Sequence, residues 1–318
     1  MIRWQRSRDS RMVRIGKVTG IGVLALIVAV LSWLALTQNR AASPAATKPP
    51  ASASPQPTAP EATTEPTPET TPTPTEAAPP AAVAPTRIVT ALTTGTLLRT
   101  TIGACEGAAP TPEYSTDGGA TWQASALTEA SPSAILRLIP GDIGQAIILD
   151  GECAPNGMWS FSEGVDWAET ADFVGSSWRF DATQPDRIFT SAGTESTLPC
   201  PALAVSFWDT TAIALCGDAT VVTTTDGAAS WSAPTPAPGA LTVAASPDGF
   251  TVLLSGGEDC AGVQVAPLAD GALGAGGACL DAQFAPGEVA MSGDGDGAVT
   301  VWAGETYARS QDGGATWG

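Results

Sequence analysis

Residues 115–122 read STDGGATW, and residues 310–317 repeat this stretch as SQDGGATW. Two weaker copies lie between them, SFSEGVDW at 160–167 and TTDGAASW at 224–231. The four copies share the frame Ser/Thr-x-Asp-x-Gly-x-Thr/Ser-Trp. In the second copy Ser162 replaces the Asp and Asp166 replaces the Thr, and in the third copy Ala228 replaces the Gly. Self-similarity of this kind indicates a repeat architecture.

The repeated motif predicts a hairpin turn. Asp117 can accept hydrogen bonds from backbone N–H groups of its own turn, while Gly118 and Gly119 supply positive φ angles without steric cost. We expect Trp122 to lie back over this hairpin as a large apolar cover. The residues to which this structural role is assigned are Ser115, Asp117, Gly119, Thr121, Trp122, Trp167, Asp226, Trp231, Ser310, Asp312, Gly314, Thr316 and Trp317.

Short apolar and β-branched runs, separated by Gly, Asp and Pro, fill the chain between the motif copies. Ile135–Ile139, Ala146–Leu149 and Ala298–Trp302 are examples. No helical period of useful length occurs after residue 87, so the pattern predicts an all-β fold. The tryptophans that end successive copies lie 45, 64 and 86 residues apart. A unit of about 40–45 residues fits a four-stranded propeller blade.

The unequal spacings indicate blades without a recognisable motif. The longest gap has room for one near Ala266–Gly271, and the middle gap for a partial one around Trp178–Phe189. We therefore predict a β-propeller of about six blades, within a range of about five to seven, over residues 87–318. The final blade is expected to lack its outer strand, which Arg87–Thr100 could supply to close the ring. A β-sandwich with coincidental turns is the alternative.

The copies at 115–122 and 310–317 resemble the Asp-box, also called the bacterial neuraminidase repeat. That motif is found in sialidases, sortilin-type receptors, some glycosidases and photosystem II stability/assembly factor-like proteins. The stretch Asp181–Phe189 is similar to a phrase that often opens blades in these propellers. The resemblance implies a propeller fold for residues 87–318. It says little about function, because the Asp-box sits on the outer edge of blades, away from the axial site.

The N-terminal part of the chain predicts a membrane anchor and a spacer. Residues 1–17 carry six basic residues and one acid, and residues 18–37 carry no charge. A run of about 20 apolar residues can cross a bilayer, and the basic flank stays in the cytoplasm. We expect a single-pass cell-membrane protein whose C-terminal domain is extracytoplasmic. A signal peptide cleaved near Ala41–Ser43 and a buried helix are the alternatives. Residues 38–86 hold 13 of the 27 prolines and are predicted to be a disordered Pro/Ala/Thr-rich linker.

Six cysteines, all after residue 87, predict disulfides in an oxidising compartment. Fifteen pairings are possible in principle. Proximity in sequence favours Cys200–Cys216 and Cys260–Cys279, which leaves Cys105–Cys153. A zinc site is disfavoured because the chain contains no histidine and no CxxC. We therefore expect neither a metal nor a cofactor.

The charge of the outer region restricts its partners. From residue 87 onward, 6 Arg, no Lys and 27 acids give a formal charge of −21. This disfavours nucleic acid and anionic sugars. The stretch Asp294–Gly297 is interpreted as a hairpin turn, with a weak calcium loop as the alternative.

A sialidase would be expected to show three arginines, a tyrosine nucleophile with a glutamate partner, and an aspartate. The stretch Leu136–Pro140 only approximates the usual Arg-Ile-Pro signature, and Tyr114 and Tyr307 fall beside Asp-box strands. Without histidine, Ser–His and Cys–His catalysis are excluded. The sequence thus favours a binding or assembly-scaffold module for a protein or a surface glycan, without enzymatic activity. The alternative is a glycan-active hydrolase, sialidase-like or another glycosidase.

Overall fold

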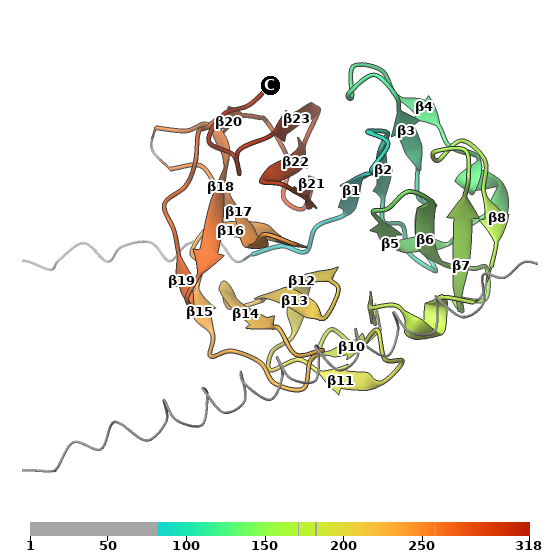
Figure 1. The fold of residues 1–318 in the computed structure, drawn as a ribbon, viewed down its shortest axis with the longest axis horizontal. Coiled ribbons are helices and arrows are strands. Elements are labelled where there is room, and N and C mark those ends of the chain that lie inside the picture. Colours follow the sequence, from blue (N-terminus) through green and yellow to red (C-terminus); the bar gives the residue numbers. More distant parts are fainter. Residues whose placement is uncertain (1–81, 171, 182, 258) are drawn as a thin grey trace, which may run out of the picture. The chain divides into compact units, whose positions relative to one another are not determined.

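Six antiparallel sheets stand around a common axis in the computed structural model (Figure 1). The structure describes residues 82–170, 172–181, 183–257 and 259–318, which belong to one compact unit. The predicted all-β propeller of six blades is confirmed. The basic tail, the predicted membrane segment 18–37 and the linker up to residue 81 lie outside the described residues. Within the described ranges, no helix is long and apolar enough to span a bilayer.

Each blade is a meander whose first strand lies nearest the axis. The strands, blade by blade, are β1 (Arg87–Ala91), β2 (Leu97–Thr101), β3 (Glu113–Ser115) and β4 (Gln123–Ala124); β5 (Ala134–Ile139), β6 (Gly144–Leu149), β7 (Pro155–Ser160) and β8 (Ala168–Glu169); β9 (Arg179–Phe180), β10 (Arg187–Phe189) and β11 (Glu195–Thr197); β12 (Ala202–Trp208), β13 (Thr211–Cys216), β14 (Thr220–Thr224) and β15 (Thr235–Pro236); β16 (Ala240–Ser246), β17 (Gly249–Ser255), β18 (Gly262–Ala269), β19 (Ala272–Leu273) and β20 (Leu280–Asp281); β21 (Val289–Gly295), β22 (Ala298–Ala303) and β23 (Thr306–Ser310). Two 3₁₀ turns, η1 (Ala126–Ala130) and η2 (Val174–Ser176), follow β4 and β8.

The Asp-box hairpins follow the third strand of blades 1, 2, 4 and 6, as the motif predicts. Asp117 accepts hydrogen bonds from the backbone N–H of Thr121 at 2.9 Å and from its hydroxyl at 2.6 Å. Gly118 and Gly119 have φ angles of 74° and 91°. Asp226 and Asp312 make the equivalent bonds. In blade 2, Ser162 takes the place of the aspartate and accepts a hydrogen bond from Asp166 N–H at 2.7 Å.

The motif tryptophans reach the preceding blade, a contact that the sequence did not predict for Trp122. Its indole meets Tyr307 of blade 6, and the indole N–H of Trp317 donates to the carbonyl of Ala278 in blade 5 at 3.0 Å. Trp167 donates to the hydroxyl of Ser125, which follows blade 1, at 2.7 Å. The physical reason is burial, because an indole placed between two blades removes more of its apolar surface from water than one that lies on a turn alone.

Ring closure also differs from the prediction. Arg87–Thr100 does not complete the last blade, because β1 and β2 are the two inner strands of blade 1. The last blade has three strands, and its β21 lies beside β1 (Figure 1). Val89, Ala290 and Trp302 form a small apolar cluster at this boundary. Since β1 already pairs with β2 along its length, side chains and not a shared strand join the first and last blades.

The two blades without a motif lie where the spacing predicted them. Blade 3 consists of three short strands that include Arg187–Phe189, and blade 5 turns at Asp270–Gly271 between β18 and β19. The stretch Asp294–Gly297 contains the end of β21 and the two-residue turn, Asp296–Gly297, that leads to β22, so the hairpin is present as predicted. The end of the predicted linker is part of the folded unit, because Thr86 donates its N–H and hydroxyl to the carbonyl of Gly287.

All three predicted disulfides are present. Cys200–Cys216 fastens the start of blade 4 to its second strand, and Cys260–Cys279 closes a loop within blade 5. Cys105–Cys153 joins the loop after β2 to the loop after β6, so it connects blades 1 and 2. The tyrosines Tyr114 and Tyr307 lie on β3 and β23, beside Asp-box hairpins, as the sequence predicts.

Candidate functional site

The innermost strands of the blades surround an axial cavity of about 330 Å³. Every blade contributes at least one apolar side chain to its wall, among them Ile88, Leu136, Phe180, Val205, Val243 and Met291, and the hydroxyl residues Thr90, Ser206, Thr242 and Ser292 also line it. The segment before β1 adds Ala84 and Pro85, and it approaches β1 across the middle of the ring in Figure 1. The cavity is therefore a mostly apolar pocket at the axis, which is the usual character of a ligand site.

Irregular pairing turns extra side chains toward this cavity. The register between β5 and β6 shifts between Ile135 and Arg137, so Leu136 is the additional residue of a bulge. The pairing register of β12 and of β16 shifts in the same way near the start of each strand, where Leu203 and Leu241 are the additional residues. A bulge places two residues of one strand opposite one of its partner and re-aims the side chains around it. As a result, consecutive residues Leu136, Arg137 and Leu138 all line the cavity.

Arg137 is the charged group that this bulge directs to the axis. Its guanidinium donates to the carbonyls of Trp178 at 3.0 Å and Phe207 at 3.3 Å, and it lies 5.2 Å from the centre of the Phe207 ring. The four ion pairs found among the described residues do not include it. Burial lowers the pKa of Arg137 to about 10, because desolvation disfavours the charged form. The cavity wall thus holds a cation without a counter-ion.

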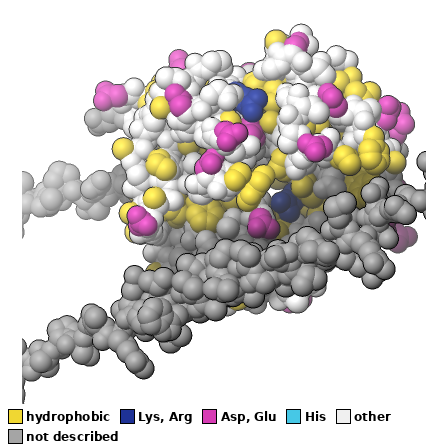
Figure 2. Space-filling model, in the orientation of Figure 1, with side chains coloured by type: hydrophobic (Ala, Val, Ile, Leu, Met, Phe, Trp, Pro, Cys, Tyr) yellow, Lys and Arg dark blue, Asp and Glu magenta, His cyan; other side chains and the backbone are white. Residues whose placement is uncertain are grey.

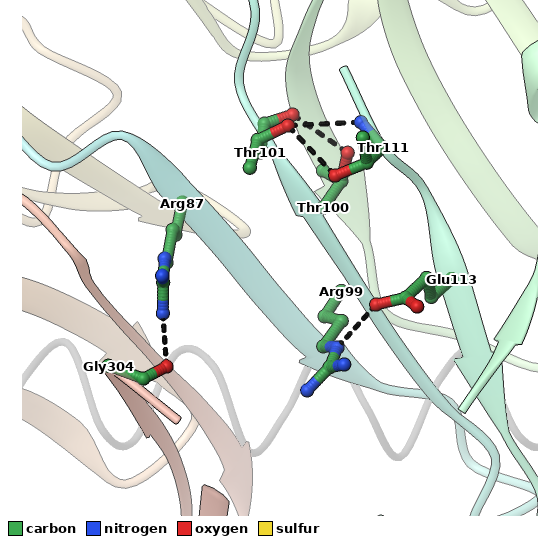
Figure 3. A network of polar contacts seen from close by, with 7 residues as sticks. All are labelled: Arg87, Arg99, Thr100, Thr101, Thr111, Glu113 and Gly304. Carbon is green, nitrogen blue, oxygen red and sulfur yellow. Dashed lines mark hydrogen bonds and ion pairs between the residues drawn. The ribbon is translucent and has the colours of Figure 1, made fainter. Parts of the chain in front are cut away.

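Arg87 also borders the cavity, but its guanidinium already has an anionic partner, Glu288. Its guanidinium donates to the carbonyl of Gly304 (Figure 3). It also lies 3.6 Å from the Glu288 carboxylate and stacks 4.2 Å over the indole of Trp302. Arg99, which points to the same boundary, is bound by Glu113 at 2.8 Å. These two arginines serve the junction of blades 1 and 6. Arg137 is the cation of the cavity that remains for a ligand.

The residues singled out from the sequence lie away from this cavity. The Asp-box side chains are at the outer hairpins, where each carboxylate is bound by its own turn. In the sequence, Arg137 belongs only to the imperfect signature Leu136–Pro140, which predicts no role for it. The available signal was a lone arginine within an otherwise apolar strand, Ile135–Ile139, which is a costly residue to bury.

The outer surface has the opposite charge to the cavity. Acidic side chains are spread over the face shown in Figure 2 and basic ones are few, in agreement with the formal charge of −21 for residues 87–318. Charges on exposed hairpins are screened by salt over about 8 Å under physiological conditions. The field inside the cavity is therefore set mainly by the groups that line it.

Meandering sheets around an axis, with Asp-box hairpins after their third strands, define an Asp-box β-propeller. No protein-family model and no curated protein matches the chain. The chain is similar to YCF48 from Cyanidioschyzon merolae, with 15% identity and a TM-score of 0.37 over 75% of this chain and 85% of that one. It is similar to AofleA from Arthrobotrys oligospora, with 10% identity and a TM-score of 0.48 over 75% and 85%. It is also similar to the Trypanosoma rangeli sialidase, with 11% identity and a TM-score of 0.36 over 74% of this chain and 54% of that one.

Proposed function

We propose that this propeller is a binding or assembly-scaffold module that takes an apolar part of a partner protein into its axial cavity. The observation that carries the proposal is the convergence of apolar side chains from all six blades on a cavity of about 330 Å³. Burying apolar surface there contributes roughly 25 cal/mol per Å². A pocket of this composition binds by excluding water.

A protein partner suits this wall better than a glycan does. Each sugar hydroxyl that enters an apolar pocket must find a hydrogen-bond partner or lose the one it had in water. A glycosidase also needs two opposed carboxylates at the reacting bond. The cavity-lining residues within the described part of the chain include neither Asp nor Glu. Tyr307, the residue type that a sialidase uses as nucleophile, packs against Trp122 between two blades.

We further propose that residues 18–37 hold the propeller outside a cell membrane. The uncharged run and its basic flank motivate this, and three disulfides fit an oxidising compartment. Deleting residues 18–37 should move the protein from the membrane fraction to the soluble fraction. Retention of the deleted form in the membrane fraction would contradict the anchor.

Filling the cavity tests the binding proposal. Val205→Trp places a large side chain on the cavity wall, whereas Val165→Trp makes the same change on an outer hairpin where the residue is 36% exposed. The full chain should cross-link a defined partner in its native membrane, and only Val205→Trp should abolish the cross-link. Equal capture by both variants would refute the cavity as the binding site. Turnover of any member of a glycoside panel by the unmodified protein would favour the hydrolase instead.

A further inference from the structure

The guanidinium of Arg137, which has no counter-ion among the described residues of the mostly apolar cavity, restricts the class of ligand that the cavity can bind. A guanidinium has five N–H donors, and the structure shows two of those on Arg137 used, both by backbone carbonyls. Its partial burial costs hydration, which the two carbonyls and the Phe207 ring replace only in part and which an anion would compensate. Leu136, Leu138 and Phe207 are apolar members of the surrounding wall, and its uncharged polar side chains include the hydroxyls of Thr90, Ser206, Thr242 and Ser292. Among the residues that the structure describes, the lining includes no carboxylate that could neutralise Arg137.

We infer that the axial cavity binds an apolar chain that ends in a carboxylate, with the carboxylate on Arg137 and the chain against the hydrophobic wall. This inference rests on the proposed binding function and specifies its ligand chemistry. A carboxylate matches the guanidinium geometrically, because both groups are planar and can form two parallel hydrogen bonds. The C-terminus of a partner protein and a free alkyl carboxylic acid both present this chemistry.

The position of Arg137 in the ring supports a ligand role. Blade 3 has only two residues, Arg179 and Phe180, in its first strand, so the wall of the cavity is thin there. Arg137 extends from blade 2 past this strand to the carbonyl of Phe207 in blade 4. It therefore holds three blades together at the axis while its charge stays unpaired. A purely structural bridge needs only the two carbonyl contacts and would show no preference among ligands.

The test measures binding of three matched probes to the full chain by calorimetry. Octanoate, octanol and octylammonium have the same alkyl chain and differ in the head group. We expect octanoate to bind about tenfold more tightly than octanol, because hydrogen bonds to charged groups contribute more free energy than hydrogen bonds between neutral groups. Octylammonium should bind most weakly. Equal affinity for octanoate and octanol would overturn the inference, although it would leave apolar binding by the cavity intact.

Variants then assign the preference to one residue. Arg137→Gln should remove the preference for octanoate while octanol still binds, and Arg137→Lys should keep part of it. The matched control is Arg179→Gln, a neighbouring arginine that stacks 3.8 Å over Phe189 and does not line the cavity. If Arg137→Gln keeps the full preference, the inference fails. If Arg137→Gln does not fold, the affinities of the three probes for the unmodified chain and for Arg137→Lys still test whether Arg137 binds the carboxylate.

A peptide arm separates the two sources of the carboxylate. A short peptide ending in Leu-Val-Leu with a free C-terminus should compete with octanoate, and the same peptide as its C-terminal amide should compete at least about tenfold less well. Competition by the acid alone assigns a protein C-terminus. Failure of both peptides, with octanoate bound, assigns a free alkyl acid and counts against the protein partner, but not against the ligand chemistry.

Discussion

The indole of Trp122 and the ring of Tyr307 meet edge to face across the boundary between the first and last blades, with their centroids 5.3 Å apart. The guanidinium of Arg99 lies 4.0 Å from the centre of the same indole and 4.7 Å from that of Trp302. Burial raises the pKa of Tyr307 to about 12, so its hydroxyl stays protonated at this junction. The ring is therefore closed here by stacked aromatic and guanidinium groups.

Removing the closing indole should loosen the whole ring. We expect Trp122→Ala to lower the free energy of unfolding by about 3 kcal/mol, because it deletes a large side chain packed on two sides. Urea denaturation of the full chain measures the change. The matched control is Phe161→Ala, another hairpin aromatic, which is 72% exposed and should cost less than about 1 kcal/mol. Similar losses for the two variants would contradict the role assigned to Trp122.

The two glycines of the first Asp-box should respond differently to the same substitution. Gly118 and Gly119 both have positive φ, but a Cβ on Gly119 would collide with the Tyr307 ring, whereas one on Gly118 meets nothing within 4 Å. Both alanine variants should carry the backbone cost of about 1–2 kcal/mol, and Gly119→Ala should lose about 1–3 kcal/mol more through overpacking. The difference between their melting temperatures is the measurement, and a zero difference would be inconsistent with the inter-blade contact.

Acid should weaken the Asp-box turns in a defined pH range. Hydrogen bonds from Thr121 and Ser115 lower the pKa of Asp117 from 3.8 to about 2, and those from Ser230 lower that of Asp226 to about 2. A carboxyl with a depressed folded-state pKa stabilises the fold above its ordinary pKa, and this contribution is lost as pH falls through the folded value. Stability should thus decline between about pH 4 and pH 2.

The variant Asp117→Asn isolates this effect. It should be less stable than the unmodified protein at pH 7 and should lose less stability between about pH 4 and pH 2, because one titrating turn is gone. Asp186→Asn is the control, since this exposed carboxyl makes no side-chain hydrogen bond in the described part of the chain. Melting temperatures in a pH series are the readout. An unchanged pH profile for Asp117→Asn would exclude the turn as the source.

The disulfides should contribute according to the chain they enclose. Cys105–Cys153 spans 48 residues and Cys200–Cys216 spans 16. Loop-closure entropy assigns them about 4 and about 3 kcal/mol, respectively. The double serine variant at positions 105 and 153 should therefore melt lower than the one at 200 and 216. The reverse order would mean that strain or residual unfolded structure dominates over loop length.

The repeats could be predicted from the sequence because the interactions that form them join residues close together in the chain. An Asp-box turn closes within eight residues, so the spacing of four residues, Ser115, Asp117, Gly119 and Thr121, determines its hydrogen bonds. The short apolar runs between the copies, which predict strands, also depend only on residues that are close together in the sequence. For this reason the blade count, the decayed blades and the disulfide pairs could all be predicted without coordinates.

Contacts between blades were decided only by the tertiary structure. Nothing adjacent in sequence to Trp122 reveals that its neighbour is Tyr307, 185 positions later. The role of Arg137 depends on a bulge and on carbonyls of two other blades. The conformation of a turn depends on short-range steric contacts and hydrogen bonds, which can be inferred from the residue types at each position. Closure and the cavity arise from which surfaces meet once the ring is complete, and that is a property of the assembled fold.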